Sequence, residues 1–184
     1  GVSLCLGPGQ AAYLPLGHLE GSADLFGAEA RAAGQMDPDR ALAMLREVLE
    51  DPAILKVGQN IKYDWKMLAR HGIRTSPIED TMLLSYALNA GAHNHGMDEL
   101  AERYLGHRCL PIKELIGSGK SQISFAQVPI GRAGEYAAED AEVTWRLWRR
   151  FRPELARERV STAYETLERP LVAVLAEAAA QRAA

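Results

Sequence analysis

Two side chains that could do chemistry share one face of a predicted helix near the end of the sequence. In EYAAEDAEVTW (135–145), Tyr136 and Asp140 are four positions apart, and residues at that spacing lie on the same face of an α-helix. Two further acids, Glu139 and Glu142, flank the carboxylate. The pattern is weak by itself, because an ordinary helix with its tyrosine in the core and its aspartate in water also fits it.

A second carboxylate makes a functional role for Tyr136 and Asp140 more specific. In KVGQNIKYDWKML (56–68) a predicted strand ends at Gly58, a polar turn follows, and Asp64 falls on the first turn of the next helix. α/β proteins bind their ligands just beyond the carboxyl ends of strands. The neighbours of Asp64 supply hydrogen-bond donors and an aromatic face, which suit a phosphate backbone and an unstacked base. These neighbours are Gln59, Asn60, Lys62 and Tyr63.

Alternating strand and helix patterns predict an α/β fold that would position these residues. Apolar runs at 2–6 and 11–16 flank GPGQ and predict a hairpin, whereas 19–36 lacks periodicity and is predicted to be a loop. Asp37 is the expected cap of a helix with Pro38 at its first position. The other predicted elements are a strand at 53–58, a helix at 61–71, a strand near 78, helices from 81 and over 97–105, a turn-rich segment at 106–129, and helices at 130–151 and 161–181.

Composition narrows the class of protein. A chain of 184 residues that is 47% hydrophobic can form one domain, with room for an appendage. Its net charge of −3 argues against bulk coating of duplex DNA, but it allows a nucleic-acid enzyme whose metals face the phosphate. Cys5 and Cys109 lack metal-ligand spacing, which predicts a reducing, cytoplasmic setting. No apolar run or leader indicates a membrane segment.

KVGQNIKYD and YAAEDAEVT resemble the second and third exonuclease motifs of the 3′–5′ proofreading domain of bacterial DNA polymerase I, in the tyrosine subclass of the DEDD superfamily. Further stretches resemble that family in the same order, among them DTMLLSYALNA, MDELAERYLGH and GSGKSQISFAQV. The resemblance implies a ribonuclease-H-like (DnaQ-like) fold, with a mixed central sheet flanked by helices. It also implies two-metal hydrolysis of the terminal phosphodiester at the single-stranded 3′ end of DNA.

The resemblance assigns a role to each candidate residue. Asp140 and Asp64 match metal-binding carboxylates, and oxygen ligands of this kind suit Mg²⁺ or Mn²⁺. Tyr136 matches the tyrosine that orients the attacking water. The residues expected to contact the single-stranded DNA end are Gln59, Asn60, Lys62 and Tyr63. An alternative is that Gln59 and Asn60 only cap the helix that carries Asp64.

One departure from the family pattern concerns its first motif, a D-x-E on a strand before residue 2, which is absent from this sequence. Two carboxylates leave most of the charge of two divalent cations uncompensated, so we expect the chain as given to bind metal poorly and to hydrolyse little. In the family fold that strand lies between 2–6 and 53–58. We therefore expect either that further residues precede Gly1 or that a strand from a second copy fills the gap in a homodimer.

The expected organisation is an exonuclease domain at 1–158 and a helical connector toward a polymerase domain at 159–184, packed at most on the edge of the core. Two other functions remain open. One is a ribonuclease D-like enzyme that trims RNA, against which GSGKSQISFAQV and ERPLVAVLAE argue. The other is an inactive exonuclease-like scaffold that braces a polymerase.

Three further motifs have plainer interpretations. GSGKS (117–121) has Glu114 where a phosphate loop needs glycine, so we expect a turn. HNH (93–95) has no acidic or thiol partner and is predicted to be a solvated turn. RLWRRFR (146–152) fits a helix end whose cations stabilise the dipole at least as well as it fits a DNA patch.

Overall fold

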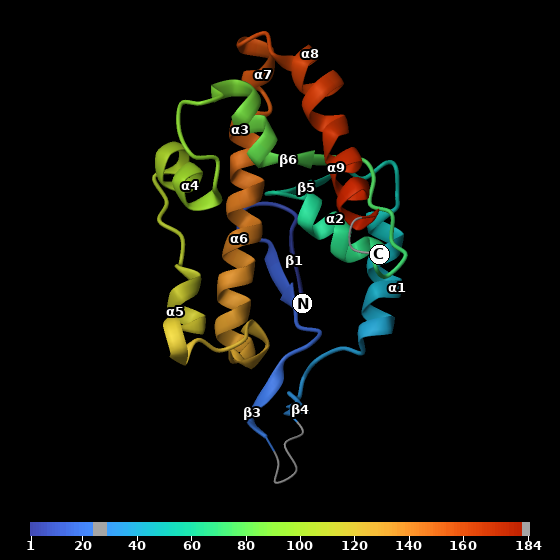
Figure 1. Ribbon diagram of the computed structural model, residues 1–184, viewed down its shortest axis with the longest axis vertical. Helices are drawn as coiled ribbons and strands as arrows, with labels where there is room; N and C mark the ends of the chain where they lie inside the picture. The colour runs from blue at the N-terminus through green and yellow to red at the C-terminus, as the bar shows by residue number, and fades with distance from the viewer. Residues whose placement is uncertain (24–28, 182–184) are drawn as a thin grey trace. The chain divides into compact units, whose positions relative to one another are not determined.

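Short strands pair two by two in the computed structural model, which describes residues 1–23 and 29–181 (Figure 1). The predicted hairpin is confirmed as an antiparallel pair in which Val2 lies opposite Leu14. A second pair is antiparallel and a third is parallel. The pairs are β1 (Val2–Cys5) with β2 (Ala11–Leu14), β3 (Leu19–Ala23) with β4 (Glu29–Arg31), and β5 (Lys56–Gly58) with β6 (Ile78–Asp80).

One expectation about strands is wrong. Residues 19–36 were expected to be a loop, but β3 and β4 lie there; the predicted loop also includes 24–28, outside the described residues. Their pairing rests on backbone hydrogen bonds between polar, glycine-containing strands, which leave no hydrophobic periodicity in the sequence. In the family fold a further strand lies between 2–6 and 53–58, and direct pairing of these two strands would contradict that placement. In the described residues β1 pairs only with β2 and β5 only with β6, so β1 and β5 do not pair directly.

The chain divides into two compact units, and the first consists of residues 1–43 and 109–142. It contains the two antiparallel pairs and the turn-rich segment, where the prediction of short helical pieces is confirmed. His18 and Val128 are buried in this unit, together with Ala133 and Ala137. The helical pieces are α5 (Ile112–Ile116) and the 3₁₀ turns η1 (Gly119–Ser121) and η2 (Phe125–Gln127), followed by the long helix α6 (Ile130–Phe151).

The second unit consists of residues 44–108 and 143–184. It holds the parallel strands β5 and β6, which are joined through α2, as a parallel pair requires. Its core is formed by side chains with no measurable exposure, among them Leu84, Leu100, Leu147 and Leu155. The helices of this unit are α2 (Lys62–Ala69), α3 (Thr81–Asn89), α4 (Met97–Leu105) and α7 (Glu154–Arg157).

Helix α1 (Pro38–Leu49) begins as predicted. The carboxylate of Asp37 accepts a hydrogen bond from the backbone N–H of Arg40 at 3.0 Å, which satisfies one of the donors at the helix start. None of the helices in residues 1–23 and 29–181 combines the length and the hydropathy needed to cross a membrane.

The C-terminal segment packs into the second unit, so the expectation that it would lie only at the edge is wrong. Tyr164 is fully buried, Val172 is 3% exposed, and the Arg169 guanidinium donates to the carbonyl of Ile78 at 2.9 Å. The predicted apolar stripe instead faces outward, since Leu167, Leu171, Val174 and Leu175 are exposed. The proposed connector role stays a prediction. The elements are α8 (Ser161–Ala163), the π-helical turn η3 (Tyr164–Glu168) and α9 (Arg169–Gln181).

Candidate active site

The first turn of α2 places three chemically useful side chains in water. Lys62, Tyr63 and Asp64 are all exposed, and the Tyr63 side chain is 64% exposed. They follow β5 directly, at the carboxyl end of a strand paired in parallel, where ligands of α/β proteins bind. Helix α2 buries none of its residues. This turn is therefore open to a ligand.

The turn is held by a carboxylate that the sequence did not single out. Asp80, which is 3% exposed, accepts hydrogen bonds from the backbone N–H groups of Asn60 at 2.9 Å and Ile61 at 3.0 Å. It also accepts from the N–H of Met82 at 2.9 Å, which caps α3. One buried side chain thus fixes the starts of two helices. An aspartate directly before a helix is a recognisable cap signal, but its bonds to the start of α2 are not visible in the sequence.

Gln59 and Asn60 have structural tasks, although neither side chain caps α2. The amide of Gln59 donates to the carbonyl of His95 at 2.8 Å and accepts from the hydroxyl of Thr81. Asn60 has a positive φ of 57°, a conformation that asparagine tolerates better than most residues. The first residue of α2 has no side-chain cap, so the alternative that these two residues cap this helix is wrong. Their contact with nucleic acid remains a prediction.

The ionised form of Asp64 is disfavoured although the residue is exposed. Loss of water around the carboxylate raises the pKa of Asp64 to about 6, and the negative charge of Asp80 adds to the shift. A hydrogen bond from its own backbone N–H acts in the opposite direction and is weaker. A positive charge beside Asp64 would relieve this cost. Such a charge would lower the pKa of Asp64 toward its ordinary value.

Tyr136 and Asp140 are partly buried in the first half of α6. The ring of Tyr136 lies 6.0 Å from the ring of Phe125, measured between centroids. The flanking acid Glu139 accepts a hydrogen bond from the backbone N–H of Leu110 at 2.8 Å, so it ties α6 to the segment before α5. The expected helix face is therefore formed, and one of the flanking acids has a structural role.

Asp64 belongs to the second unit, whereas Tyr136 and Asp140 belong to the first. The expected convergence of the two carboxylates therefore stays a prediction, as do the roles of all three residues. Within residues 1–23 and 29–181, no three His, Cys, Asp or Glu side chains gather closely enough to hold a metal ion.

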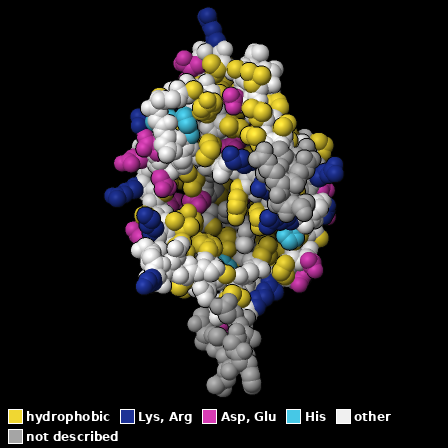
Figure 2. All heavy atoms as spheres, in the orientation of Figure 1, with side chains coloured by type: hydrophobic (Ala, Val, Ile, Leu, Met, Phe, Trp, Pro, Cys, Tyr) yellow, Lys and Arg dark blue, Asp and Glu magenta, His cyan; other side chains and the backbone are white. Residues whose placement is uncertain are grey.

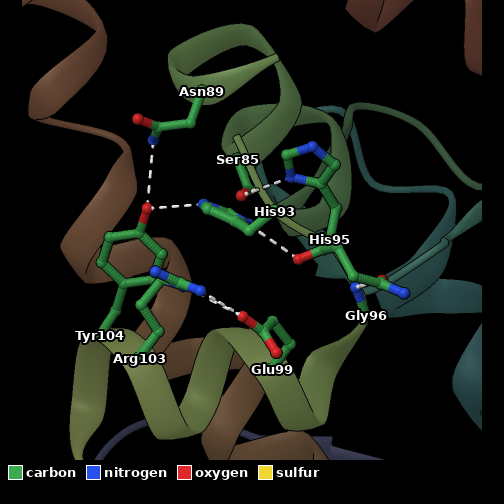
Figure 3. A network of polar contacts seen from close by, with 9 residues as sticks. Ser85, Asn89, His93, His95, Gly96, Glu99, Arg103 and Tyr104 are labelled. Carbon is green, nitrogen blue, oxygen red and sulfur yellow. Dashed lines mark hydrogen bonds and ion pairs between the residues drawn. The ribbon is translucent and has the colours of Figure 1, made fainter. Parts of the chain in front are cut away.

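The HNH segment is more than the solvated turn that its sequence predicts (Figure 3). His93 shares a hydrogen bond with the Tyr104 hydroxyl at 2.9 Å, and His95 shares one with the Ser85 hydroxyl at 2.9 Å. Burial and the neighbouring His93 lower the pKa of His95. Because Ser85 belongs to α3 and Tyr104 to α4, the two histidines fasten the loop between these helices.

The other two motifs behave as expected. Residues 119–121 of GSGKS form a 3₁₀ turn. Two arginines of RLWRRFR have ion-pair partners within the protein. Arg150, near the end of α6, pairs with Glu154 at 2.6 Å, and Arg152, just after the helix, pairs with Glu79 at 2.9 Å and with Glu165 at 2.7 Å. These ion pairs favour a structural role for Arg150 and Arg152.

Comparison with known proteins places the chain among nucleases. It is 50% identical to DNA polymerase I of Rhizobium leguminosarum over 91% of its length, and 42% identical to that of Pseudomonas aeruginosa over 96%. It spans only 16% and 19% of those proteins. The structure of Brucella melitensis NrnC bound to pGG is similar in fold, with a TM-score of 0.61 at 19% identity, over 95% of this chain and 79% of that one.

This likeness confirms the α/β, exonuclease-like fold class. Residues 6–156 match the model of a family described as 3′-5′ exonuclease, and this range contains Asp64, Tyr136 and Asp140. The chain belongs to the 3′–5′ exonuclease family.

Proposed function

We propose that the chain removes nucleotides from the single-stranded 3′ end of DNA, as the proofreading exonuclease that accompanies a polymerase domain in a cytoplasmic DNA polymerase I. The observation that carries this proposal is the exposed row of Lys62, Tyr63 and Asp64 at the carboxyl end of β5, in a chain of the exonuclease family. The relatives in Rhizobium and Pseudomonas support DNA as the substrate.

Each residue of the turn has a physical role toward a DNA end. The ammonium of Lys62 attracts a phosphate, and the exposed ring of Tyr63 offers a face on which an unstacked base can lie. Stacking of this kind accepts any base, as removal of a mispaired nucleotide requires. Gln59 and Asn60 contribute by holding the turn in place, through His95 and Asp80.

Asp64 and Asp140 supply oxygen donors of the kind that Mg²⁺ and Mn²⁺ prefer, and Tyr136 is proposed to orient the attacking water. When bound, such cations stabilise charge on the phosphate oxygens and lower the pKa of water. The two carboxylates cannot balance the charge of two divalent cations. The chain as given therefore fits only part of such a site, and we expect it to bind metal weakly and to hydrolyse slowly.

The surface charge is compatible with a few specific contacts rather than general attraction to DNA. On the face shown in Figure 2, Lys and Arg side chains are interspersed with acidic and hydrophobic ones instead of forming one basic patch. The net charge of −3 likewise argues against general attraction to DNA.

The test compares two 5′-labelled oligonucleotides of one sequence, one DNA and one RNA. Each is incubated with Mg²⁺ and the full-length protein, meaning the proposed DNA polymerase I that contains this chain. Stepwise loss of 3′ nucleotides from DNA, faster than from RNA, is the expected result. Faster loss from RNA would favour the ribonuclease D-like alternative. No loss from either, in Mg²⁺ or Mn²⁺, would favour the inactive scaffold.

A further inference from the structure

His18 is a buried histidine that the proposed function does not use. It lies between β2 and β3 in the first unit and is 2% exposed. Its backbone is clamped by the side chain of Gln35, which accepts from the His18 N–H at 2.7 Å and donates to the His18 carbonyl at 2.8 Å. Such a placement fixes where the imidazole ring can point.

Both ring nitrogens of His18 have partners. Nδ1 lies 2.9 Å from the carbonyl oxygen of Val128, which can only accept, so Nδ1 carries a proton. Nε2 lies 2.7 Å from the hydroxyl of Tyr13. Burial raises the pKa of the Tyr13 phenol, which therefore keeps its hydrogen beside Nε2. The two partners thus hold the ring in one orientation, with a proton on Nδ1.

The hydrogen bond from His18 to Val128 holds the backbone just before α6. Val128 is buried, and the carbonyl of the following Pro129 accepts the hydrogen bond of Ala133 at 3.0 Å in the first turn of the helix. The His18 ring also lies 5.9 Å from the ring of Phe125, between centroids, and Phe125 in turn contacts the ring of Tyr136. The imidazole therefore touches both the backbone before α6 and the aromatic ring beside Tyr136.

We propose that His18 is a positioning residue for Tyr136: its Nδ1–H bond to Val128 and its ring contact with Phe125 fix the start of α6 and the orientation of the Tyr136 ring. This rests on the proposed function, because Tyr136 must take part in the reaction for its position to affect the rate. It predicts that loss of the Nδ1 donor lowers kcat while leaving KM unchanged, because His18 is not placed among the residues that contact the DNA end.

Two substitutions distinguish the contribution of Nδ1 of His18 from that of Nε2. His18→Asn places an amide donor near the position of Nδ1 and retains the bond to Val128, whereas His18→Gln reaches the position of Nε2 and loses it. In the full-length protein we expect His18→Gln to lower kcat by up to about tenfold, no more than Tyr136→Phe does, and His18→Asn to keep most of the activity. Tyr13→Phe, which removes only the Nε2 partner, should have a smaller effect.

A double variant tests whether His18 acts through Tyr136. If it does, His18→Gln combined with Tyr136→Phe is no slower than the slower single variant, because residues that act as a unit are not additive. Multiplicative effects would show a general structural role and overturn the inference. A normal rate for Tyr136→Phe alone would instead count against the proposed role of Tyr136.

Hydrogen exchange in the chain itself gives a readout that needs no activity. His18→Gln should speed amide exchange at residues 133–137 about tenfold, while residues 145–151 at the other end of α6 serve as the internal control. Unchanged exchange at 133–137 would overturn the positional claim, whatever the kinetics. If His18→Gln does not fold, exchange at the same amides in Tyr13→Phe decides the question, since a modest local increase is expected there and none would contradict the inference.

Discussion

The starts of α2 and α3 each carry an aspartate, and the two aspartates have opposite surroundings. Asp80 is buried before α3 and accepts three backbone N–H groups, from Asn60, Ile61 and Met82. Asp64 is exposed in the first turn of α2, where a hydrogen bond from its own backbone N–H favours its charge. Desolvation raises the pKa of both carboxyls; at Asp64 the carboxylate loses surrounding water although the residue as a whole is exposed.

The difference separates a carboxylate that builds the fold from one that is available to a ligand. The three donors on Asp80 leave little capacity for anything else, and they join the polar turn after β5 to the start of α3. Asp64 stabilises no neighbouring element through a comparable set of bonds in the described residues, and its ionised form is disfavoured. The proposed function gives Asp64 a role outside the fold, as an oxygen donor to a cation.

The largest expected effect is on activity. Asp64→Ala or Asp140→Ala in the full-length protein should reduce 3′–5′ hydrolysis about a thousandfold or more, because each removes an oxygen donor that stabilises charge in the reaction. The assay is single-turnover release of the terminal nucleotide from a labelled single strand. Asp98→Ala is the matched control, since Asp98 is an exposed acid in the first turn of α4. Normal hydrolysis by Asp64→Ala would show that Asp64 is not needed for the reaction, so the contrast between a structural Asp80 and a functional Asp64 would not hold.

The second effect is on stability. Asp80→Ala should lower the free energy of unfolding by about 3 kcal/mol or more, because it leaves buried backbone donors without an acceptor. Asp80→Asn keeps one carbonyl oxygen and should lose less. Urea unfolding of the chain measures both, as a lower midpoint at an unchanged slope. A midpoint for Asp80→Ala equal to that of the wild type would show that water replaces the carboxylate and that Asp80 does not hold the turn.

The contrast also shows what the sequence could and could not reveal about the site. Asp64 was found because it follows a strand signal and lies among donors in a recognisable motif. Asp80 carries the ordinary signal of a helix cap, but its hydrogen bonds to residues 60 and 61 cross about twenty positions and depend on the parallel pairing of β5 with β6. His18 gave no signal, since a lone histidine in a polar segment does not reveal burial.

The same reasoning separates the predictable parts of the fold from the rest. α1 and α6 were predicted with their observed starts, because capping and periodicity are local properties. The pair β3–β4 was missed because its strands are polar. The packing of the C-terminal segment was missed because Tyr164 and Val172, rather than the more obvious leucines, face the second unit. The first error comes from a strand pair without hydrophobic periodicity, and the second from packing between residues far apart in the sequence.

A smaller effect on activity is expected at the tyrosine. Tyr136→Phe in the full-length protein should slow hydrolysis about tenfold, because it removes one hydrogen bond to the proposed water while the aromatic contact with Phe125 remains. Phe125→Leu is the complementary variant, since it disturbs the ring contact but keeps the phenol. A rate for Tyr136→Phe as low as that for Asp140→Ala would show that the phenol has a larger role than orienting water.

The smallest effect is the pH dependence of stability that Asp64 introduces. Its pKa is about 6 in the folded chain and 3.8 ordinarily, so between these values the folded state retains a proton that the unfolded state releases. The contribution of Asp64 to stability therefore falls as pH rises through this window and is constant above it. Asp64→Asn should match the wild type below the window and become the more stable of the two above it. Because Asp64 is exposed, solvent screening keeps the gain well below the loss expected for Asp80→Ala.

Urea midpoints at closely spaced pH values, with wild type and variant compared in each buffer, measure this difference. Asp80 is present in both proteins, so its own titration cancels to first order. Asp98→Asn controls for the loss of a negative charge near the positive end of a helix dipole, and it should be slightly less stable than the wild type at neutral pH. If Asp64→Asn behaves like Asp98→Asn, Asp64 is an ordinary first-turn acid that favours its helix. A gain that develops through the window would instead show that the fold tolerates an unfavourable charge at the position proposed to bind a cation.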